Sequence, residues 1–368
     1  DAYVVKFDSN GNFIWAKQIG GSDNDEATSI STDSSDNILV GGSFRGVIDI
    51  DGDGSNDLTA SPSSSTIFWD DAYVAKFDSN GNLIWAKQIG GSSYDYAYSI
   101  TTDSSDNILV GGSFRGVIDI DGDGSNDLSS NGWDDAYVVK FDSDGNLIWA
   151  KQIGGSSYDT ANSITTDSSD NILVGGYFGQ NRHNRDHIDI DGDGSNDLTS
   201  NGSRDAYVAK FDSDGNFIWA KQIGGDDYAK GITTDSSGNV LVGGSFRREN
   251  IDIDGDGNDD LSSNGWADAY VVKFSDTIIE DEGTATFAKD TNNTYWIIDG
   301  DQKLQLQNGQ GVNYSDNTTP HWDGVAVEAN ESGGYRFLLQ GQNNLSEQAY
   351  IWTTNSQGVI TGGSGWKS

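Results

Sequence analysis

Four short stretches of the chain concentrate the residues that could bind a metal ion. "IDIDGDGSNDL" begins at Ile48, Ile118 and Ile188, and the variant "IDIDGDGNDDL" begins at Ile251. Each stretch follows the pattern D-x-D-x-D-G-x-x-D, with aspartates at positions 1, 3, 5 and 9 and the glycine that a sharp turn needs at position 6. Alternate carboxylates on a tightly curled loop point inward, and a cage of hard oxygens suits Ca²⁺. Mg²⁺ requires a smaller, stricter octahedron and keeps its water.

The pattern therefore predicts four calcium sites, in which the residue at position 7 contributes its backbone carbonyl. The predicted ligands are Asp49, Asp51, Asp53, Ser55 and Asp57; Asp119, Asp121, Asp123, Ser125 and Asp127; Asp189, Asp191, Asp193, Ser195 and Asp197; and Asp252, Asp254, Asp256, Asn258 and Asp260. Without a cation, such carboxylates should repel one another and raise one another's pKa. Ion binding should therefore contribute to the folding free energy of each loop.

These loops differ from EF-hands. Position 12 holds Ala60, Ser130, Ser200 or Ser263 in place of the bidentate Glu, and strand-like residues precede each loop. They are similar to the short calcium loops of integrin-type propellers and thrombospondin type 3 repeats. We expect affinities of about 10⁻⁴–10⁻³ M, as in extracellular modules. A solvated acidic turn is the alternative, but the regular spacing of aspartates and glycine in every copy favours calcium.

The composition excludes several classes of partner and chemistry. The chain has 58 Asp and Glu against 21 Lys and Arg, a formal net charge of −37. This charge argues against nucleic acid and anionic membrane surfaces as partners. No apolar run approaches the length of a membrane span, and no signal peptide is visible. Cysteine is absent, which excludes disulfides, thiolate metal sites and a cysteine nucleophile.

The acidic stretches belong to a repeat. "DAYV" occurs at Asp1, Asp71, Asp135, Asp205 and Asp268, with spacings of 70, 64, 70 and 63 residues. Each period begins with a core of 44 residues, or 42 in the fourth copy. An insert that carries the acidic stretch follows the core. The chain begins inside a repeat and contains no Met, so we expect it to be a fragment of a longer protein.

Each core predicts four short strands. "AYVVKF" and "NFIWAKQI" are rich in β-branched and aromatic residues, and "DSNGN" between them is a strong hairpin signal. "ATSISTD" and "NILVGGSF" form a second pair around "SSDN". No segment of the repeats shows sustained helical periodicity. Four strands in about 44 residues is the size of a β-propeller blade, whereas a parallel β-helix usually has shorter repeats.

"DAYVAKFDSNGNLIWAKQIGGSSYDYAYSITTDSSDNILVGGSF" resembles the bacterial β-propeller repeat called SBBP. The resemblance covers residues 1–274. It implies a propeller and no enzymatic activity. Together with the strand and loop patterns above, it leads us to expect an all-β propeller of four-stranded blades with calcium-loop inserts. The family is known mainly as a structural repeat of extracellular bacterial proteins.

The order of strands within the propeller sets where each blade begins. The "TDSSDNILV" pair should lie innermost, so that Asp268–Phe274 becomes the third strand of the last blade. Residues 3–19 could supply its missing outer strand and close the ring. A closed four-bladed ring and a piece of a larger one both remain open at this point.

Two sets of identical side chains recur at fixed places in the repeat. They are Trp15, Trp85, Trp149 and Trp219, and Lys6, Lys76, Lys140, Lys210 and Lys273. A ring of aromatic and basic groups around a pocket is one interpretation. Packing between blades is the favoured one, because a repeat buries its faces against its neighbours and needs the same residues in each copy. The glycine pairs, such as Gly111–Gly112, indicate close backbone approach, since no phosphate-loop Lys-Ser/Thr follows them.

Residues 276–368 predict a separate small β domain. Alternating runs such as "YRFLLQG" and "AYIWTT" indicate strands. "W-x-x-x-A-x-E", "Y-I-W" and the final "SGW" resemble the tryptophan-rich C-terminal domain of large cyanobacterial surface and haemolysin-like proteins. Trp296, Trp322, Trp352 and Trp366 could form a carbohydrate-stacking face, but an aromatic core is favoured.

The sequence favours a non-enzymatic, calcium-binding module of an extracellular or cell-surface protein, secreted and used for adhesion or structure. Calcium ions are the expected partners, with glycans or another surface protein as further candidates, and neither nucleic acid binding nor membrane insertion is expected. The alternative is a protein that binds or hydrolyses carbohydrate through a propeller face or the tryptophan-rich domain. An enzyme should show acids or histidines that break the symmetry. The insert at residues 179–188, with His183 and His187, is the one such segment, and a transition-metal site there is disfavoured because no further ligands support the pair.

Overall fold

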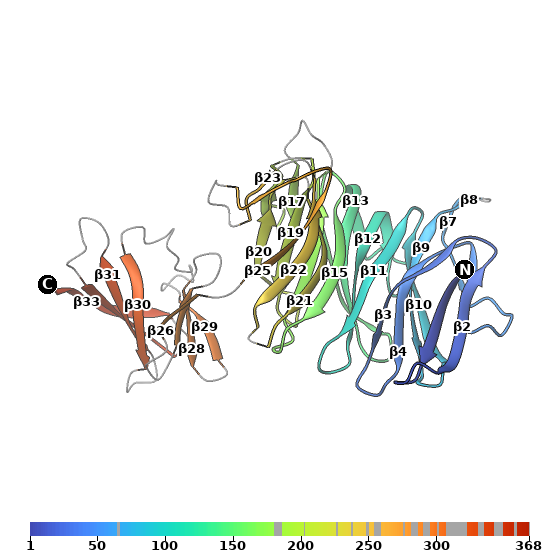
Figure 1. The fold of residues 1–368 in the computed structure, drawn as a ribbon, viewed down its shortest axis with the longest axis horizontal. Helices are drawn as coiled ribbons and strands as arrows, with labels where there is room; N and C mark the ends of the chain where they lie inside the picture. The colour runs from blue at the N-terminus through green and yellow to red at the C-terminus, as the bar shows by residue number, and fades with distance from the viewer. Residues whose placement is uncertain are drawn as a thin grey trace. The chain divides into compact units, whose positions relative to one another are not determined.

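The computed structural model forms two compact units, Asp1–Lys273 and Phe274–Ser368 (Figure 1). It describes residues 1–64, 67–179, 186–201, 203–225, 227–236, 238–247, 250–253 and 259–273 of the first unit, and 274, 277–280, 286–289, 295–299, 302–306, 322–329, 335–341, 349–356 and 359–367 of the second. Every regular element of the described residues is a β-strand. The predicted all-β class is therefore confirmed.

The second blade, which spans parts of the second and third copies of the repeat, shows the organisation of the blades. Its strands are β11 (Asp95–Thr102), β12 (Ile108–Asp119), β13 (Leu128–Phe141) and β14 (Leu147–Gly155), and they pair antiparallel in that order. Asp142 fixes the hairpin between β13 and β14, because its carboxylate accepts the backbone N–H and the side-chain amide of Asn146, both at 2.8 Å. The predicted hairpins and the predicted blade boundaries are confirmed.

The neighbouring blades repeat this arrangement. The first blade contains β3 (Asp25–Thr32), β4 (Ile38–Arg45), β9 (Asp70–Phe77) and β10 (Leu83–Gly91); the third contains β15 (Thr160–Thr166), β16 (Ile172–Phe178), β19 (Asp205–Phe211) and β20 (Phe217–Ile223). The fourth has three strands, β21 (Asp227–Thr234), β22 (Val240–Phe246) and β25 (Asp268–Phe274). The last of these is the predicted third strand.

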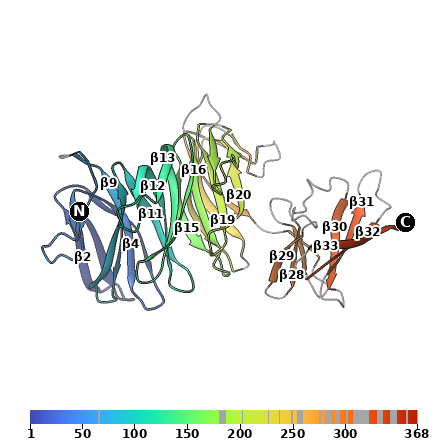
Figure 2. The ribbon, with the colours of Figure 1, turned by 180° about the vertical axis from the view of Figure 1, so that it is seen from behind.

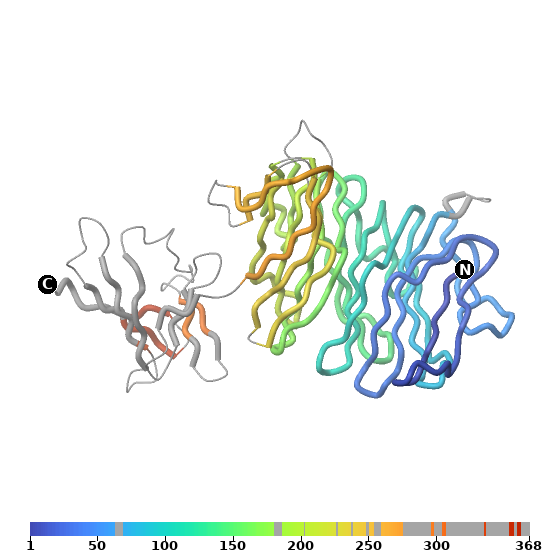
Figure 3. The backbone as a smooth tube through the Cα atoms, in the orientation of Figure 1, coloured from blue at the N-terminus to red at the C-terminus, as the bar shows by residue number. Residues whose placement is uncertain are grey.

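The blades do not close into a ring. The N-terminal hairpin of β1 (Ala2–Phe7) and β2 (Phe13–Gly21) lies at one end of the first unit, and β25 lies at the other (Figures 1–3). Within the described residues, neither strand of this hairpin pairs with β25. The first unit is thus an open row of blades, and closure by residues 3–19 is not seen.

Short strands in the inserts and in the second unit complete the fold. The inserts contain β5 (Val47–Asp49), β6 (Leu58–Thr59), β7 (Pro62–Ser64), β8 (Ile67–Phe68), β17 (His187–Asp189), β18 (Leu198–Thr199), β23 (Asn250–Ile251) and β24 (Leu261–Ser262). The second unit contains one four-stranded sheet of β26 (Thr277–Glu280), β27 (Thr286–Lys289), β28 (Tyr295–Asp299) and β29 (Gln302–Gln305), and another of β30 (Trp322–Ala329), β31 (Tyr335–Gly341), β32 (Ala349–Thr354) and β33 (Ile360–Lys367). This unit is the expected small β-rich region.

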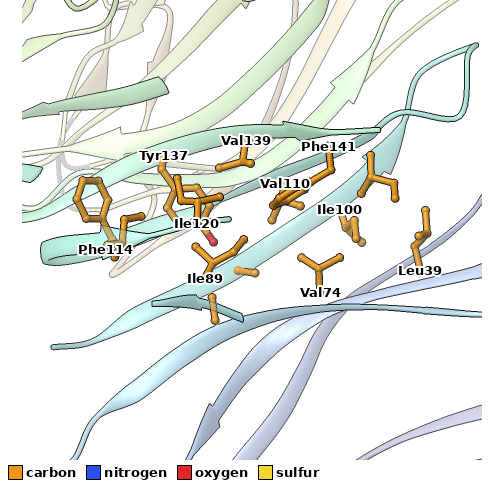
Figure 4. Close-up of a cluster of buried hydrophobic side chains, with 14 residues drawn as sticks. Leu39, Val74, Ile89, Ile100, Val110, Phe114, Ile120, Tyr137, Val139 and Phe141 are labelled. Atoms are coloured by element: carbon orange, nitrogen blue, oxygen red, sulfur yellow. The ribbon is translucent and has the colours of Figure 1, made fainter. Parts of the chain in front are cut away.

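The hydrophobic core lies between successive blades. Leu39 and Val74 of the first blade pack in one buried cluster with Val110 and Phe141 of the second (Figure 4). A blade is a single sheet, so its apolar faces are covered by the next blade. Neighbouring innermost strands also bond directly, since the Ile100 N–H donates to the Ser29 hydroxyl across the junction at 3.1 Å.

The recurring Lys and Trp side chains pack between blades, as predicted. Lys140 pairs with Asp103 of its own blade at 2.9 Å and donates to the Ser213 carbonyl of the next blade, also at 2.9 Å. The Trp85 indole N–H donates to the Ser143 carbonyl of the following blade at 3.2 Å. Both side chains therefore fix the register of one blade on its neighbour. Gly112 confirms the predicted close approach, because a Cβ there would lie 1.9 Å from the Tyr96 carbonyl oxygen.

Buried aspartates at the same junctions were not predicted. Asp71 and Asp135, the first residues of "DAYV" motifs, are completely buried, and Oδ1 of each has no hydrogen-bond partner among the described residues. Burial raises the pKa of Asp71 to about 7 and that of Asp135 to about 6. Burial likewise raises the pKa of Asp95, and the negative charge of nearby Asp71 raises it further. The blade junctions thus hold carboxyl groups whose burial stabilises the protonated form relative to that of an exposed aspartate.

Replacing Lys140 by Met should destabilise the protein by about 3–5 kcal/mol, because the substitution leaves the carboxylate of Asp103 buried without its cation. The measurement is the free energy of unfolding in urea. Lys273→Met is the matched control: the Lys273–Asp235 pair occupies the equivalent place, but its lysine side chain is 52% exposed. That change should cost about 0–1 kcal/mol. Equal losses in the two variants would contradict the bridging role.

Stability without calcium should decrease as the pH rises from about 4 to about 7. The folded state binds the Asp71 proton more tightly than the unfolded chain does, so this contribution is complete below the unfolded pKa and is lost as the pH passes the folded value of about 7. Asp71→Asn should flatten this decline and raise the free energy of unfolding at about pH 8 by roughly 1–3 kcal/mol. Thermal melts at several pH values in excess chelator measure this pH dependence.

Asp268→Asn is the control, because Asp268 is the half-buried first residue of the fifth "DAYV" motif, and it should leave the pH dependence unchanged. If Asp71→Asn kept the pH dependence of the wild type, the decline would not arise from Asp71.

Candidate metal centres

Each described acidic loop lies at a junction between two blades. The second loop follows β12, and its first residues pair with the outer strand of the preceding blade, Gly90 with Asp119 and Gly91 with Ile118. The same pairing joins Gly20 to Asp49 in the first loop and Gly154 to Asp189 in the third. A loop that belongs to one blade is therefore attached to the edge of its neighbour. Ordering the loop would secure the junction.

Backbone hydrogen bonds curl each loop around its first aspartate. In the second loop, the Asp119 carboxylate accepts the N–H of Gly122 at 2.7 Å and that of Gly124 at 2.8 Å. The Ile120 N–H donates to Oδ2 of Asp127 at 2.7 Å, which closes the loop. Gly124, at position 6, has a φ of 87°, so the predicted sharp turn is present. Nothing would lie within 4 Å of a Cβ on Gly124, which shows that its backbone conformation, rather than crowding, requires the glycine.

Carboxylates converge in the three described loops. In each loop, three aspartates offer oxygens that all lie within 4.8 Å of one another: Asp49, Asp51 and Asp53; Asp119, Asp121 and Asp127; and Asp189, Asp191 and Asp197. Two ligands on opposite sides of a calcium ion, each at about 2.4 Å, would be about 4.8 Å apart. The carboxylate groups therefore fit a Ca²⁺ ion in spacing and in ligand type.

The remaining predicted ligands lie at the edges of these groups. Asp57, Asp123 and Asp193 are outside the carboxylate clusters of their loops. Oδ1 of Asp123 instead accepts the Ser125 N–H at 2.7 Å. The carbonyls of Ser55, Ser125 and Ser195 stay predicted ligands.

The fourth loop is described only in part. Asp254, Asp256 and Asn258 lie outside the described residues. Asp252 and Asp260 are described, and the Ile253 N–H donates to Oδ2 of Asp260 at 2.7 Å. This bond matches the one that closes the second loop. The part of the fourth loop that the structure describes thus follows the same pattern.

The sequence predicts that clustered carboxylates raise one another's pKa. This prediction is confirmed at one loop aspartate and is wrong at three others. Burial raises the pKa of Asp191, and the charges of Asp197, Asp193 and Asp189 raise it further. At Asp53, Asp123 and Asp193 the predicted rise is wrong: a hydroxyl donor from the serine two residues on, followed by its backbone N–H, lowers the pKa. These hydrogen bonds favour the charged form of the three carboxylates.

A polar cavity opens beside two of the loops. The cavity at the third loop has a volume of about 470 Å³ and is lined by Asp189, Asp191, Lys151 and Gln152 among others. The cavity at the second loop has about 310 Å³ and is lined by the equivalent Asp119 and Asp121. An ion and its remaining water ligands have room to enter there. His187 lies near the third loop, where its Nδ1 lies 2.8 Å from the Thr199 hydroxyl, and His183 is outside the described residues.

The SBBP family, described as a beta-propeller repeat, matches residues 14–43, 84–113, 148–177 and 218–245. The chain therefore contains four SBBP β-propeller repeats, as the sequence predicts. Curated relatives include an uncharacterised WD repeat-containing protein of Acanthamoeba polyphaga mimivirus, 26% identical over 239 residues, and the regulatory protein FlaEY of Caulobacter vibrioides, 29% identical over 179 residues. These matches cover 57% and 48% of this chain but only 16% and 18% of the relatives.

Similar solved structures include a protein of unknown function from Bacteroides caccae, with a TM-score of 0.32, 8% identity and coverage of 96% of this chain and 86% of that one. The PQQ domain of pyranose dehydrogenase from Coprinopsis cinerea has a TM-score of 0.29, 10% identity and coverage of 95% and 85%. Such low scores support no conclusion about activity. No helix among the described residues is long and apolar enough to cross a membrane.

Gly124→Ala should weaken cation binding at the second loop about tenfold, because a positive φ costs an L-residue about 1–2 kcal/mol. Calorimetric titration with calcium chloride would measure the affinity. The control is Gly231→Ala in β21, where a Cβ meets nothing within 4 Å and φ is not positive. That variant should bind like the wild type. An unchanged titration of Gly124→Ala would show that the turn does not shape the site.

Proposed function

We propose that this chain is a non-enzymatic, calcium-stabilised module of a larger extracellular or cell-surface protein, serving adhesion or structure. The observation that carries the proposal is the convergence of three carboxylates in each of three loops that join neighbouring blades. Ca²⁺ is the cation whose ligand preference and size suit such all-oxygen groups.

The position of the loops supports a structural role for the ion. The clustered carboxylates repel one another, and a bound cation removes this repulsion only in the folded loop. Because each loop pairs with the preceding blade, the binding free energy contributes to the stability of the row of blades.

Weak calcium sites favour an extracellular location. The loops lack the bidentate Glu of high-affinity sites, so dissociation constants of about 10⁻⁴–10⁻³ M are expected. Ions would fill such sites in extracellular fluid or seawater. The absence of cysteine and the acidic surface agree with a secreted bacterial protein. The resemblance of residues 276–368 to the tryptophan-rich domain of cyanobacterial surface proteins favours the same setting.

Calcium should raise the melting temperature, and chelator should lower it. At about 10 mM Ca²⁺, each loop with the expected affinity should contribute about 1.4–2.7 kcal/mol. The same concentration of Mg²⁺ should not reproduce this stabilisation, because Mg²⁺ demands a smaller octahedral site. The measurements are thermal melts and equilibrium dialysis, with four ions expected per chain.

Asp121→Ala should remove one of the four ions and the corresponding stabilisation. Asp144→Ala is the charge-matched control, since Asp144 is an exposed hairpin residue outside the loops. It should leave both the stoichiometry and the calcium response unchanged. Identical responses of the two variants, or full rescue by Mg²⁺, would refute the proposal.

A further inference from the structure

The second and third copies of the repeat are nearly identical over 32 residues, and their few differences lie in one region. The 32 residues from Leu83 to Phe114 match those from Leu147 to Phe178 except at three positions. The differing pairs are Tyr96 and Thr160, Tyr98 and Asn162, and Ser113 and Tyr177. Packing between blades demands the same residues in each copy. Differences confined to so few positions point to a requirement other than packing.

The three differing positions of the second copy are in contact. Tyr96 and Ser113 are partners across the β11–β12 pair, and the Ser113 hydroxyl donates to the Tyr98 hydroxyl at 3.2 Å. The rings of Tyr96 and Tyr98 stack at 5.8 Å with an interplanar angle of 11°. The copies have therefore diverged in one continuous patch of surface.

This patch extends into a row of aromatic rings on an arginine. Tyr94 stacks on Tyr96 at 6.3 Å, and the guanidinium carbon of Arg115 lies 5.8 Å from the centre of the Tyr94 ring. The same guanidinium carbon lies 5.2 Å from the Trp133 ring, which stacks on Tyr158 at 5.5 Å. We call Tyr94, Tyr96, Tyr98, Arg115, Trp133 and Tyr158 the aromatic row.

The aromatic row is accessible to a ligand. Trp133 is 55% exposed, and the three tyrosines at positions 94, 96 and 98 are half-buried. Trp133 is located at the end of the insert that carries the second acidic loop. Several partly solvent-exposed aromatic side chains, with hydrogen-bonding groups beside them, are typical of a recognition surface.

The charges of the row exclude a polyanion and favour a neutral ligand. The Nε of Arg115 pairs with Oδ1 of Asp134 at 2.5 Å, so the local charge is balanced. The chain as a whole has a net charge of −37, which repels nucleic acids and acidic polymers. The ion pair still offers guanidinium N–H donors and carboxylate acceptors beside the rings.

We propose that the aromatic row binds a neutral saccharide. Flat aromatic rings can cover the C–H faces of a pyranose, while Arg115, Asp134 and the tyrosine hydroxyls match its ring of hydroxyl groups. This ligand rests on the proposed adhesion function, for which it supplies the target.

Affinity electrophoresis of the full chain in native gels tests the proposal. Dextran, mannan and galactomannan serve as neutral probes, and alginate as the anionic probe. At least one neutral polysaccharide should retard the chain. Trp133→Ala should weaken that retardation about tenfold, as expected for a central aromatic anchor. Ile148→Ala is the control, since Ile148 is 49% exposed in the same blade but outside the row.

A second variant replaces residues of the aromatic row with those found at the same positions of the third copy, which are compatible with the blade fold. Tyr96→Thr combined with Tyr98→Asn and Ser113→Tyr gives the second copy the residues that the third copy carries at Thr160, Asn162 and Tyr177. It should keep the melting temperature and calcium response of the wild type and lose retardation about tenfold. Three results would overturn the saccharide site: no retardation by any neutral probe, retardation by alginate alone, or loss on Trp322→Ala in the second unit with both row variants unaffected. An intact calcium response in any of these cases would leave the proposed function standing.

Discussion

Mutual repulsion among clustered carboxylates is the constraint on which this architecture depends. The glycine turns and backbone hydrogen bonds of each described loop force three aspartates into one small volume. Like charges at such separations are unfavourable unless a cation or a proton compensates them. The serine donors keep part of each loop ionised, as at Asp123. This geometry supports the proposed binding of a divalent ion in each loop.

The carboxylates inside the blade junctions and those at the solvent edge of the junctions differ in how their charge is compensated. Inside the junction, Lys140 neutralises Asp103, and the buried Asp71 favours its protonated form. At the solvent edge, the calcium ion that we propose would compensate the carboxylates of the acidic loop. Low pH therefore favours the interior carboxyl groups, whereas calcium favours the edge. The stability of the row should respond to both, through different residues of the same interface.

The local features of the fold were predictable from the sequence. The hairpins follow from "DSNGN" and "SSDN", the blade boundaries follow from the repeat, and the junction roles of Lys140 and Trp85 follow from their recurrence. Each of these depends on near neighbours or on periodicity. The positive φ of Gly124 likewise follows from its place in the loop pattern.

Features that depend on contacts between distant segments were not predictable. Nothing near Asp71 in the sequence indicates burial against Gln88 and the next blade. The aromatic row joins residues from four segments of the chain, and their contacts become visible only in the folded structure. The predicted rise in pKa is wrong at Asp53 because Ser55 donates two hydrogen bonds to its carboxylate, which the spacing of the aspartates alone does not indicate. Ring closure was left open by the sequence, and the structure shows an open row.

The most direct test of the calcium assignment is a crystal structure of the chain grown in about 10 mM calcium chloride, with anomalous differences recorded. The account predicts an anomalous peak in each acidic loop, surrounded by six to eight oxygens at about 2.3–2.6 Å. Loops that contain only water at full occupancy, with no anomalous signal among the aspartates, would contradict it.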